Sequence, residues 1–82
     1  MADFSLKTNF SVDGERYLLS TVKLPCSCNP SYKTMLFKVN KRNEVNYKDL
    51  YCMKYHTQQE AEVGHKELLL CIEHGERFWE ND

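Results

Sequence analysis

The residues of this chain with the most specific chemistry are its four cysteines and three histidines. Cys26 and Cys28 form a close pair, but structural zinc sites usually place about two to four residues between their first two ligands and require a second pair. No second pair follows, because the other candidates are scattered along the chain at Cys52, Cys71, His56, His65 and His74. We therefore expect free thiols, no metal site and no cofactor.

Catalysis by a cysteine nucleophile requires a histidine beside the thiol and a third group that orients the imidazole. The sequence gives no indication that such groups meet. It also contains no Gly-x-Ser-x-Gly, Walker-type or His-Glu-x-x-His motif. We therefore expect a protein that is not an enzyme, and a metal- or cysteine-dependent enzyme is the third-ranked alternative.

Tyrosines interleaved with lysines provide the candidate binding residues Tyr32, Lys33, Tyr51 and Lys54. Aromatic and basic side chains on an open sheet can stack on bases and contact phosphates. However, the formal net charge of the chain is −1, which argues against general phosphate binding, and the glycine-rich signature of an RNA-recognition sheet is missing. Tyrosine is also a favourable strand residue, so we expect a protein partner in preference to nucleic acid.

His65, the fifth candidate binding residue, lies in a helix predicted from about Gln58 to His74. Thr57 and Glu60 have the spacing of a capping box at its start, and Gly75 is placed to be the left-handed residue after its end. One stripe of this helix should face a sheet, and it contains Ala61, Gly64, His65, Leu68 and Ile72.

A buried imidazole on that stripe needs a hydrogen-bond partner. For His65, a satisfied core histidine is the more common explanation, and a ligand-binding residue is the alternative. Gly64 costs the helix roughly 1 kcal/mol relative to alanine. We therefore expect its role to be steric, in allowing the helix to approach the sheet closely.

Four strands should precede the helix. Apolar and polar residues alternate from Phe4 to Val12, and Asp13-Gly14 is typical of a type I′ turn before a strand from Glu15 to about Leu24. This turn predicts the cross-strand pairs Phe10–Tyr17, Thr8–Leu19 and Leu6–Thr21. After a loop bounded by Pro25 and Pro30, further strands are predicted over about Tyr32–Asn40 and Tyr47–Tyr55.

The predicted fold class is α+β: a four-stranded, mostly antiparallel sheet (ββββα) with the C-terminal helix packed on one face. The opposite face, where several tyrosines and lysines should lie, would be free for association. Phe78 and Trp79 either fold back over a sheet edge or stand exposed. All 82 residues should form one domain.

Charge and size also bear on partners. Residues 1–56 contain nine Lys or Arg and five Asp or Glu, whereas residues 57–82 contain two and seven. The helix and tail should therefore be acidic, either as a solvated surface or as a docking surface for a basic partner.

A chain this short has marginal stability, so a homodimer is the default expectation. It has no apolar run near the roughly 20 residues of a membrane span and no secretory signal, so we expect the cytoplasm.

Three segments resemble a group of small phage and prophage proteins. Residues 20–24 read Ser-Thr-Val-Lys-Leu, residues 32–37 read Tyr-Lys-Thr-Met-Leu-Phe, and residues 54–57 read Lys-Tyr-His-Thr before Glu60-Ala61 and Gly64-His65. In that group the segments read approximately Ser-Thr-Val-Trp-Leu, Phe-Glu-Thr-Met-Val-Phe and Arg-Tyr-x-Thr, before Glu-Ala and Gly-His. The chain departs from the group at Lys23, where tryptophan is usual, and at residues 25–28, which replace a segment that often ends in Asp-His. The resemblance implies a phage origin but does not imply a particular activity.

From these features we expect a small phage accessory protein that binds a host macromolecule stoichiometrically in the host cytoplasm. Its target would be a host defence or metabolic factor that it inhibits. The alternative is an oligomer that sequesters a nucleotide or other small ligand between subunits.

Overall fold

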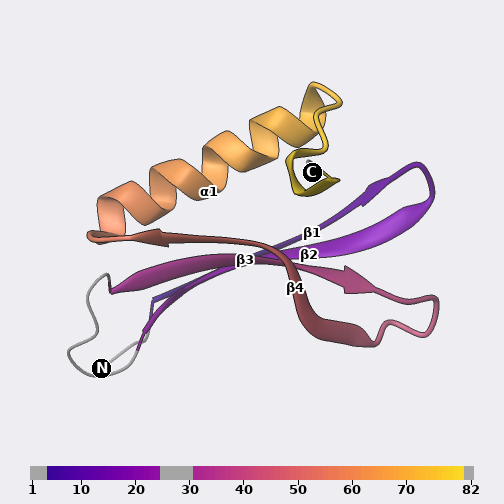
Figure 1. Cartoon of the computed structure of the whole chain (residues 1–82), viewed down its shortest axis with the longest axis horizontal. Helices are drawn as coiled ribbons and strands as arrows, with labels where there is room; N and C mark the ends of the chain where they lie inside the picture. The colour runs from indigo at the N-terminus through magenta and orange to yellow at the C-terminus, as the bar shows by residue number, and fades with distance from the viewer. Residues whose placement is uncertain (1–3, 25–30, 81–82) are drawn as a thin grey trace.

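The chain folds as a four-stranded antiparallel meander followed by one helix. The computed structural model describes residues 4–24 and 31–80. Its elements, in chain order, are β1 (Ser5–Val12), β2 (Glu15–Lys23), β3 (Tyr32–Val39), β4 (Val45–Tyr55), α1 (Gln58–Glu73) and the short 3₁₀ helix η1 (Phe78–Glu80). The strands lie in the order β1-β2-β3-β4, and α1 lies along one face of the sheet (Figure 1). The predicted α+β fold with the order ββββα is confirmed.

The hairpin between β1 and β2 has the predicted turn and register. Asp13 and Gly14 have φ angles of 52° and 82°, the left-handed conformation that both central residues of a type I′ turn require. Because this turn determines the register, one face of the hairpin is apolar or β-branched. The predicted pairs are confirmed: Phe10–Tyr17, Thr8–Leu19 and Leu6–Thr21.

Strand β4 begins two residues earlier than predicted and is bent. Leu36 of β3 pairs with Tyr51, whereas Lys38 pairs with Asn46. Residues 47–50 of β4 therefore lie opposite a single residue of β3, Phe37. A bulge of this kind bends the strand that carries the extra residues, and Figure 1 shows the first half of β4 turning away from α1.

Helix α1 begins at Gln58, as predicted, because Thr57 and Glu60 form a capping box at its first turn. The Thr57 hydroxyl accepts a hydrogen bond from the Glu60 amide at 3.1 Å, and the Glu60 carboxylate accepts one from the Thr57 amide at 3.2 Å. This reciprocal pair satisfies two backbone donors that the helix itself leaves free.

The helix ends one residue earlier than predicted, at Glu73, in a Schellman motif. Gly75 has a φ of 84°. Its amide donates to the Ile72 carbonyl at 3.0 Å, while the Glu76 amide donates to the Cys71 carbonyl at 2.9 Å. Among the described residues, no helix combines the length and apolar character needed to cross a membrane.

The hydrophobic core lies between α1 and the two central strands. Leu19 of β2, Leu36 of β3 and Ala61 of α1 are completely buried there. The predicted helix stripe is confirmed, because Gly64 and His65 are also buried. Leu68 and Ile72 continue this stripe as half-buried side chains.

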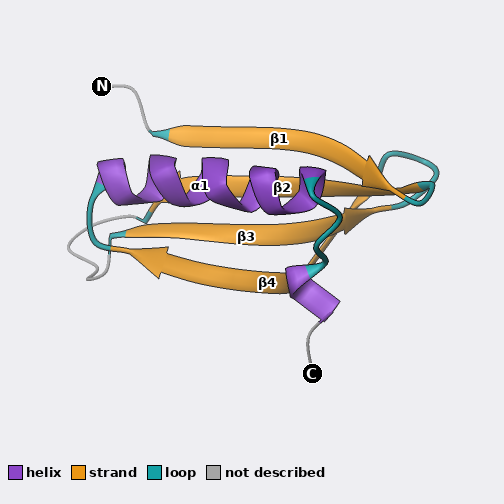
Figure 2. Ribbon diagram, turned by 90° about the horizontal axis from the view of Figure 1, so that it is seen from above, coloured by secondary structure: helices purple, strands orange, loops and turns teal. Residues whose placement is uncertain are grey.

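The segment after α1 folds back over the sheet, which decides between the two arrangements that the sequence allows. The Trp79 ring lies 5.1 Å from the Tyr17 ring, measured between centroids, and 6.1 Å from the Phe10 ring. The Phe78 ring contacts Tyr51 of β4 edge-on at 4.7 Å. The tail therefore closes the end of the core that α1 does not reach (Figure 2).

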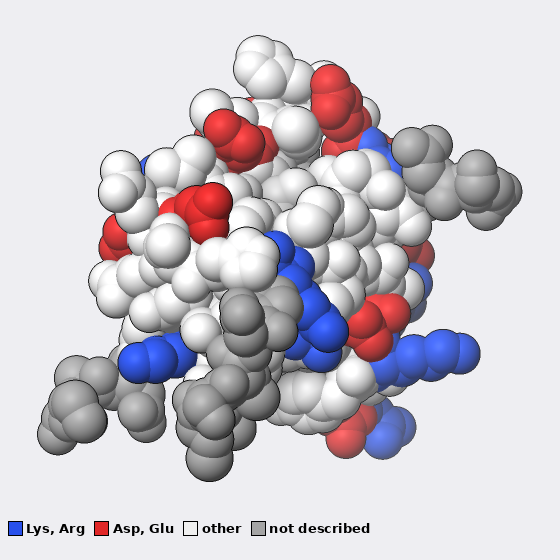
Figure 3. All heavy atoms as spheres, turned by 60° about the vertical axis from the view of Figure 1, so that its left-hand side comes forward, with Lys and Arg blue, Asp and Glu red and all other residues white. Residues whose placement is uncertain are grey.

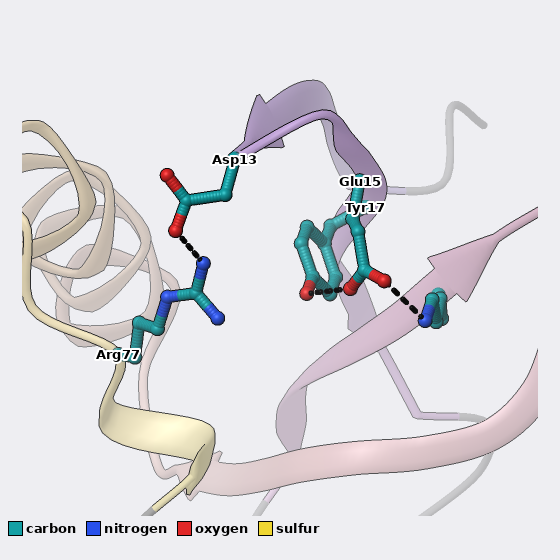
Figure 4. Close-up of polar contacts among 5 residues, drawn as sticks. Asp13, Glu15, Tyr17 and Arg77 are labelled. Atoms are coloured by element: carbon teal, nitrogen blue, oxygen red, sulfur yellow. Dashed lines mark hydrogen bonds and ion pairs between the residues drawn. The ribbon is translucent and has the colours of Figure 1, made fainter.

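Polar contacts hold this returning segment to the first hairpin. Arg77 forms an ion pair with Asp13 of the β1–β2 turn (Figure 4). Beside it, the Tyr17 hydroxyl donates to the Glu15 carboxylate at 3.0 Å, and the Lys38 ammonium lies 3.1 Å from the other Glu15 oxygen. Lys38 and then Tyr17 lower the pKa of Glu15 through these contacts.

Candidate binding site

A buried hydrogen-bond network joins α1 to three strands. The His65 ring is 4% exposed. Its Nδ1 lies 2.7 Å from the hydroxyl of Thr21 on β2, and its Nε2 lies 3.0 Å from the hydroxyl of Thr8 on β1. The Thr21 hydroxyl is in turn 2.6 Å from that of Thr34 on β3. Both ring nitrogens have partners, so His65 is the satisfied core histidine expected from its position.

The protonation of His65 follows from this environment. A neutral imidazole has one donor and one acceptor nitrogen, which the two threonine hydroxyls can match. Burial lowers the pKa of His65, because the charged ring would lose its hydration. With 4% exposure, the ring has no open path to a substrate. Its place in the structure is that of an anchor for α1.

Gly64 allows a tyrosine ring to pass beneath the helix. A Cβ atom added at Gly64 would lie 2.3 Å from the hydroxyl oxygen of Tyr55 and 2.4 Å from the ring carbon that carries it. Both distances are far below van der Waals contact, so no other residue fits without displacing Tyr55. The predicted steric role of Gly64 is confirmed.

The face of the sheet opposite α1 combines lysines with apolar side chains. Thr34 and Leu36 of β3 point toward α1, so the residues between and beside them point away. Lys33 on this side lies directly opposite Lys54 of β4. We define the open face by Lys33, Lys54 and the side chains that surround them on the same side of the sheet: Leu18, Val22, Met35, Phe37 and Cys52.

The apolar part of the open face is covered unevenly. Leu18, Val22 and Met35 are half-buried, and Cys52 is exposed. Phe37 is 5% exposed, because the first half of β4 bends over it and the Tyr47 ring packs against it edge-on at 5.4 Å. The bend in β4 thus buries one end of the open face and leaves the other end half-buried or exposed.

The five candidate binding residues do not form one site. Lys33 and Lys54 are neighbours on the open face. Tyr51 pairs with Leu36, and Tyr32 is on the same side as Thr34, so both tyrosines belong to the helix-covered face. His65 is in the core.

The expectation that several tyrosines lie on the open face is wrong. Tyr17, Tyr32, Tyr51 and Tyr55 are on the helix-covered face, where Tyr17 contacts Trp79 and Tyr51 contacts Phe78. The alternation of residues between the two sides of the sheet was predicted correctly for β3 and β4. The choice of side depends on which set packs under the helix, and bulky rings are needed there because one helix is narrower than four strands.

Charge is unevenly distributed over the molecule. Figure 3 shows carboxylates over the upper part, where α1 lies in Figure 1, and most of the blue side chains in the lower half, next to further carboxylates. The predicted acidic character of the helix follows from Glu60, Glu62, Glu67 and Glu73. Lys33 and Lys54 place like charges opposite each other on the open face, an arrangement that destabilises a sheet by a fraction of a kcal/mol.

A groove that the sequence did not reveal runs between α1 and β4. Its volume is about 570 Å³, and its floor consists of the side chains of Tyr51, Met53 and Tyr55. Val63 and Glu67 of α1 form part of its wall. Val63 lies outside the predicted core stripe of the helix, and this is the one signal by which the sequence could have indicated the groove.

Neither metal binding nor cysteine chemistry is favoured by the described part of the chain. Within residues 4–24 and 31–80, no three His, Cys, Asp or Glu side chains gather in a way that could hold a metal ion. Cys52 and Cys71 are free thiols. Burial raises the pKa of Cys71, and the Glu76 carboxylate raises it further, which disfavours the reactive thiolate. Cys26 and Cys28 lie outside the described residues.

Comparison with known proteins gives no further indication of function. No protein-family model, curated protein or solved structure matches this chain. The open face and the groove beside α1 are therefore the features from which a function can be argued.

Proposed function

We propose that this chain is a small accessory protein of phage origin that binds a host macromolecule stoichiometrically and inhibits a host defence or metabolic factor. The observation that carries the binding role is the open face, which lies away from α1 and bears paired lysines beside apolar side chains. The phage origin is supported by the three segments that resemble small phage and prophage proteins. Action in the host cytoplasm is part of the same proposal.

The composition of the open face is appropriate for a protein partner. Half-buried Leu18, Val22 and Met35 can lose their remaining water on association, and methionine is enriched at such interfaces. Lys33 and Lys54 lie at the same end of the face, where they could pair with carboxylates. A partner with acidic side chains would relieve their mutual repulsion, so the lysine pair supports an acidic target surface.

Binding is also a better explanation of the polar residues than turnover. The imidazole best placed by sequence for acid–base chemistry, that of His65, has both nitrogens bonded to threonine hydroxyls beneath the helix. General acid–base catalysis requires the catalytic group to reach the substrate. The charged groups of the open face as defined above are the ammonium groups of Lys33 and Lys54, which suit recognition.

Affinity capture from a lysate of the host bacterium tests this proposal. The immobilised wild-type protein should enrich one host protein or complex, and Lys33→Glu/Lys54→Glu should lose it. The matched control is Lys41→Glu/Arg42→Glu, which makes the same change in charge at exposed positions of the β3–β4 turn and should retain the partner.

Two further outcomes decide the matter. Calorimetric titration of the captured protein should give a fixed stoichiometry, and its activity should fall as the complex forms. Capture of nothing above background, or equal capture by the wild-type protein and the open-face variant, would refute binding through the open face.

A further inference from the structure

The helix-covered side of the sheet is only partly filled by α1 and by the segment that follows it. A helix with its side chains is about 10 Å wide, whereas adjacent strands are about 4.8 Å apart, so four strands can accommodate two helices side by side. Seen from above, the ribbon of α1 lies over β2, and the segment after α1 crosses toward β4 at one end, where Phe78 contacts Tyr51 (Figure 2). Between α1 and the exposed part of β4 lies the groove of about 570 Å³.

The groove presents apolar side chains that the chain itself leaves in solvent. Met53 on its floor is 43% exposed, and Val63 on its wall is 47% exposed. Leu70, which is 52% exposed, follows Val63 by two helical turns and therefore lies on the same side of α1. These residues form an apolar strip parallel to the groove.

Charge on the groove is of one sign. Glu60 and Glu67 line it, and no lysine or arginine of the described residues does. Glu60 is engaged in the helix cap, which leaves Glu67 as the main carboxylate over the groove. Burial raises the pKa of Tyr55, and the nearby Glu67 carboxylate adds to this effect. The groove would therefore favour a partner segment that carries positive charge.

We propose that the groove between α1 and β4 binds a basic amphipathic helix of a partner protein. Its apolar stripe would cover Met53 and Val63, and its lysines or arginines would meet Glu67. A second copy of α1 is a poor occupant, because that helix is itself acidic. This surface lies on the opposite side of the sheet from the open face, so the proposal goes beyond the proposed function and does not depend on it.

A helix explains the lining residues better than an added strand. The floor consists of Tyr51, Met53 and Tyr55, whose side chains point up from β4 toward the helical layer. A strand pairing with the free edge of β4 would lie beside its backbone, in the plane of the sheet. An element in the same layer as α1 would contact the exposed Met53 from above, which a strand in the plane of the sheet would not.

Nuclear magnetic resonance titration of the full chain with synthetic peptides tests this inference. The probe is a peptide of about 18 residues, since shorter isolated helices are marginal in water, with leucines at helical spacing and lysines elsewhere. We expect it to shift the amide signals of Tyr51–Tyr55 and Val63–Cys71. One control peptide has the same composition with alternating leucines, and a second replaces lysine with glutamate; both should bind at least about tenfold more weakly.

Variants of the chain make the test specific. Val63→Ser and Glu67→Lys are at exposed positions, so they should retain the wild-type melting temperature, and each should weaken the helical peptide by about tenfold. Glu73→Lys makes the same charge change on α1 outside the groove lining and should bind like wild type.

The inference is overturned by any of three results. These are equal binding of the alternating or glutamate peptide, shifts that map to the open face, and no shift at about 1 mM helical peptide. Protection of the β4 amides from hydrogen exchange by the alternating peptide would indicate strand addition in place of a docked helix. None of these results would affect capture through Lys33 and Lys54, so the two proposals fail independently.

Discussion

On the helix-covered face, the hydroxyls of Thr8, Thr21 and Thr34 bond to His65 or to one another in the core, whereas on the open face Lys33 and Lys54 carry like charges side by side. Among the described residues, no buried side-chain nitrogen or oxygen lacks a partner. Polar groups under the helix thus stabilise one packing arrangement. The like charges of the lysine pair do not stabilise the isolated chain, so a role in recognition is the better explanation for the pair.

The largest difference between the faces should appear at Gly64, where the Tyr55 ring lies against the helix. Gly64→Ala should lower the free energy of unfolding by about 3 kcal/mol, because the new methyl group would overlap the Tyr55 ring and the core would be overpacked. The gain in helix propensity, roughly 1 kcal/mol, is too small to offset this loss. Urea denaturation followed by circular dichroism measures the effect.

A double-mutant cycle isolates the contact between Gly64 and Tyr55. In a Tyr55→Ala background the overlap is removed, so Gly64→Ala should then be neutral or should stabilise the protein by up to about 1 kcal/mol. An equal loss in both backgrounds would mean that the glycine is needed for another reason.

Removal of the buried imidazole should have the next largest effect. His65→Leu conserves much of the volume but removes both hydrogen bonds, leaving the Thr8 hydroxyl without this partner and Thr21 with Thr34 alone. We expect a loss of about 2 kcal/mol in the free energy of unfolding. The control His74→Leu, at the exposed residue after α1, should change it by no more than about 0.5 kcal/mol. Equal losses in the two variants would contradict the anchoring role of His65.

The same histidine should make folding sensitive to mild acid. Burial lowers the folded-state pKa of His65 below its ordinary value of 6.5, so the unfolded chain takes up a proton first as the pH falls. The free energy of unfolding should therefore decrease below about pH 6.5, with a slope of at most about 1.4 kcal/mol per pH unit, and level off below the folded-state pKa.

The pH effect is measured as a difference between two proteins. His56, His74 and the carboxylates are common to the wild-type protein and His65→Asn, so subtracting their stability profiles between about pH 5 and 8 leaves the contribution of His65. Parallel profiles for the two proteins would show that burial of the ring does not disfavour its charged form.

Local signals in the sequence predicted much of the helix-covered face. The Asp13-Gly14 turn determined the register of the first hairpin, and the spacing of Thr57 and Glu60 located the start of α1. The steric role of Gly64 and the burial of His65 followed from their position on one helix stripe. These features depend on residues that are close in sequence or on a single periodicity.

Features that depend on long-range contacts were not predictable in the same way. Pairing across three strands decides which side of β4 lies under the helix, the side of Tyr51 and Tyr55 or the side of Cys52 and Lys54. The alternation of residues alone is symmetric between these two choices. The bend of β4 arises from four residues opposite Phe37, which no local pattern marks. The groove beside α1 exists because of where the helix lies across the sheet.

The smallest expected effect completes the comparison, because it should show that the open face is dispensable for folding. Lys33→Ala/Lys54→Ala removes two like charges from adjacent strands, so stability should rise slightly or stay constant, within about 0.5 kcal/mol. Any rise should shrink when salt is added, since salt already screens the repulsion between exposed charges. Melting temperatures in low and high salt measure both effects. A loss comparable to that of His65→Leu would mean that the lysine stems are part of the core packing, and the distinction between a face for stability and a face for binding would then be wrong.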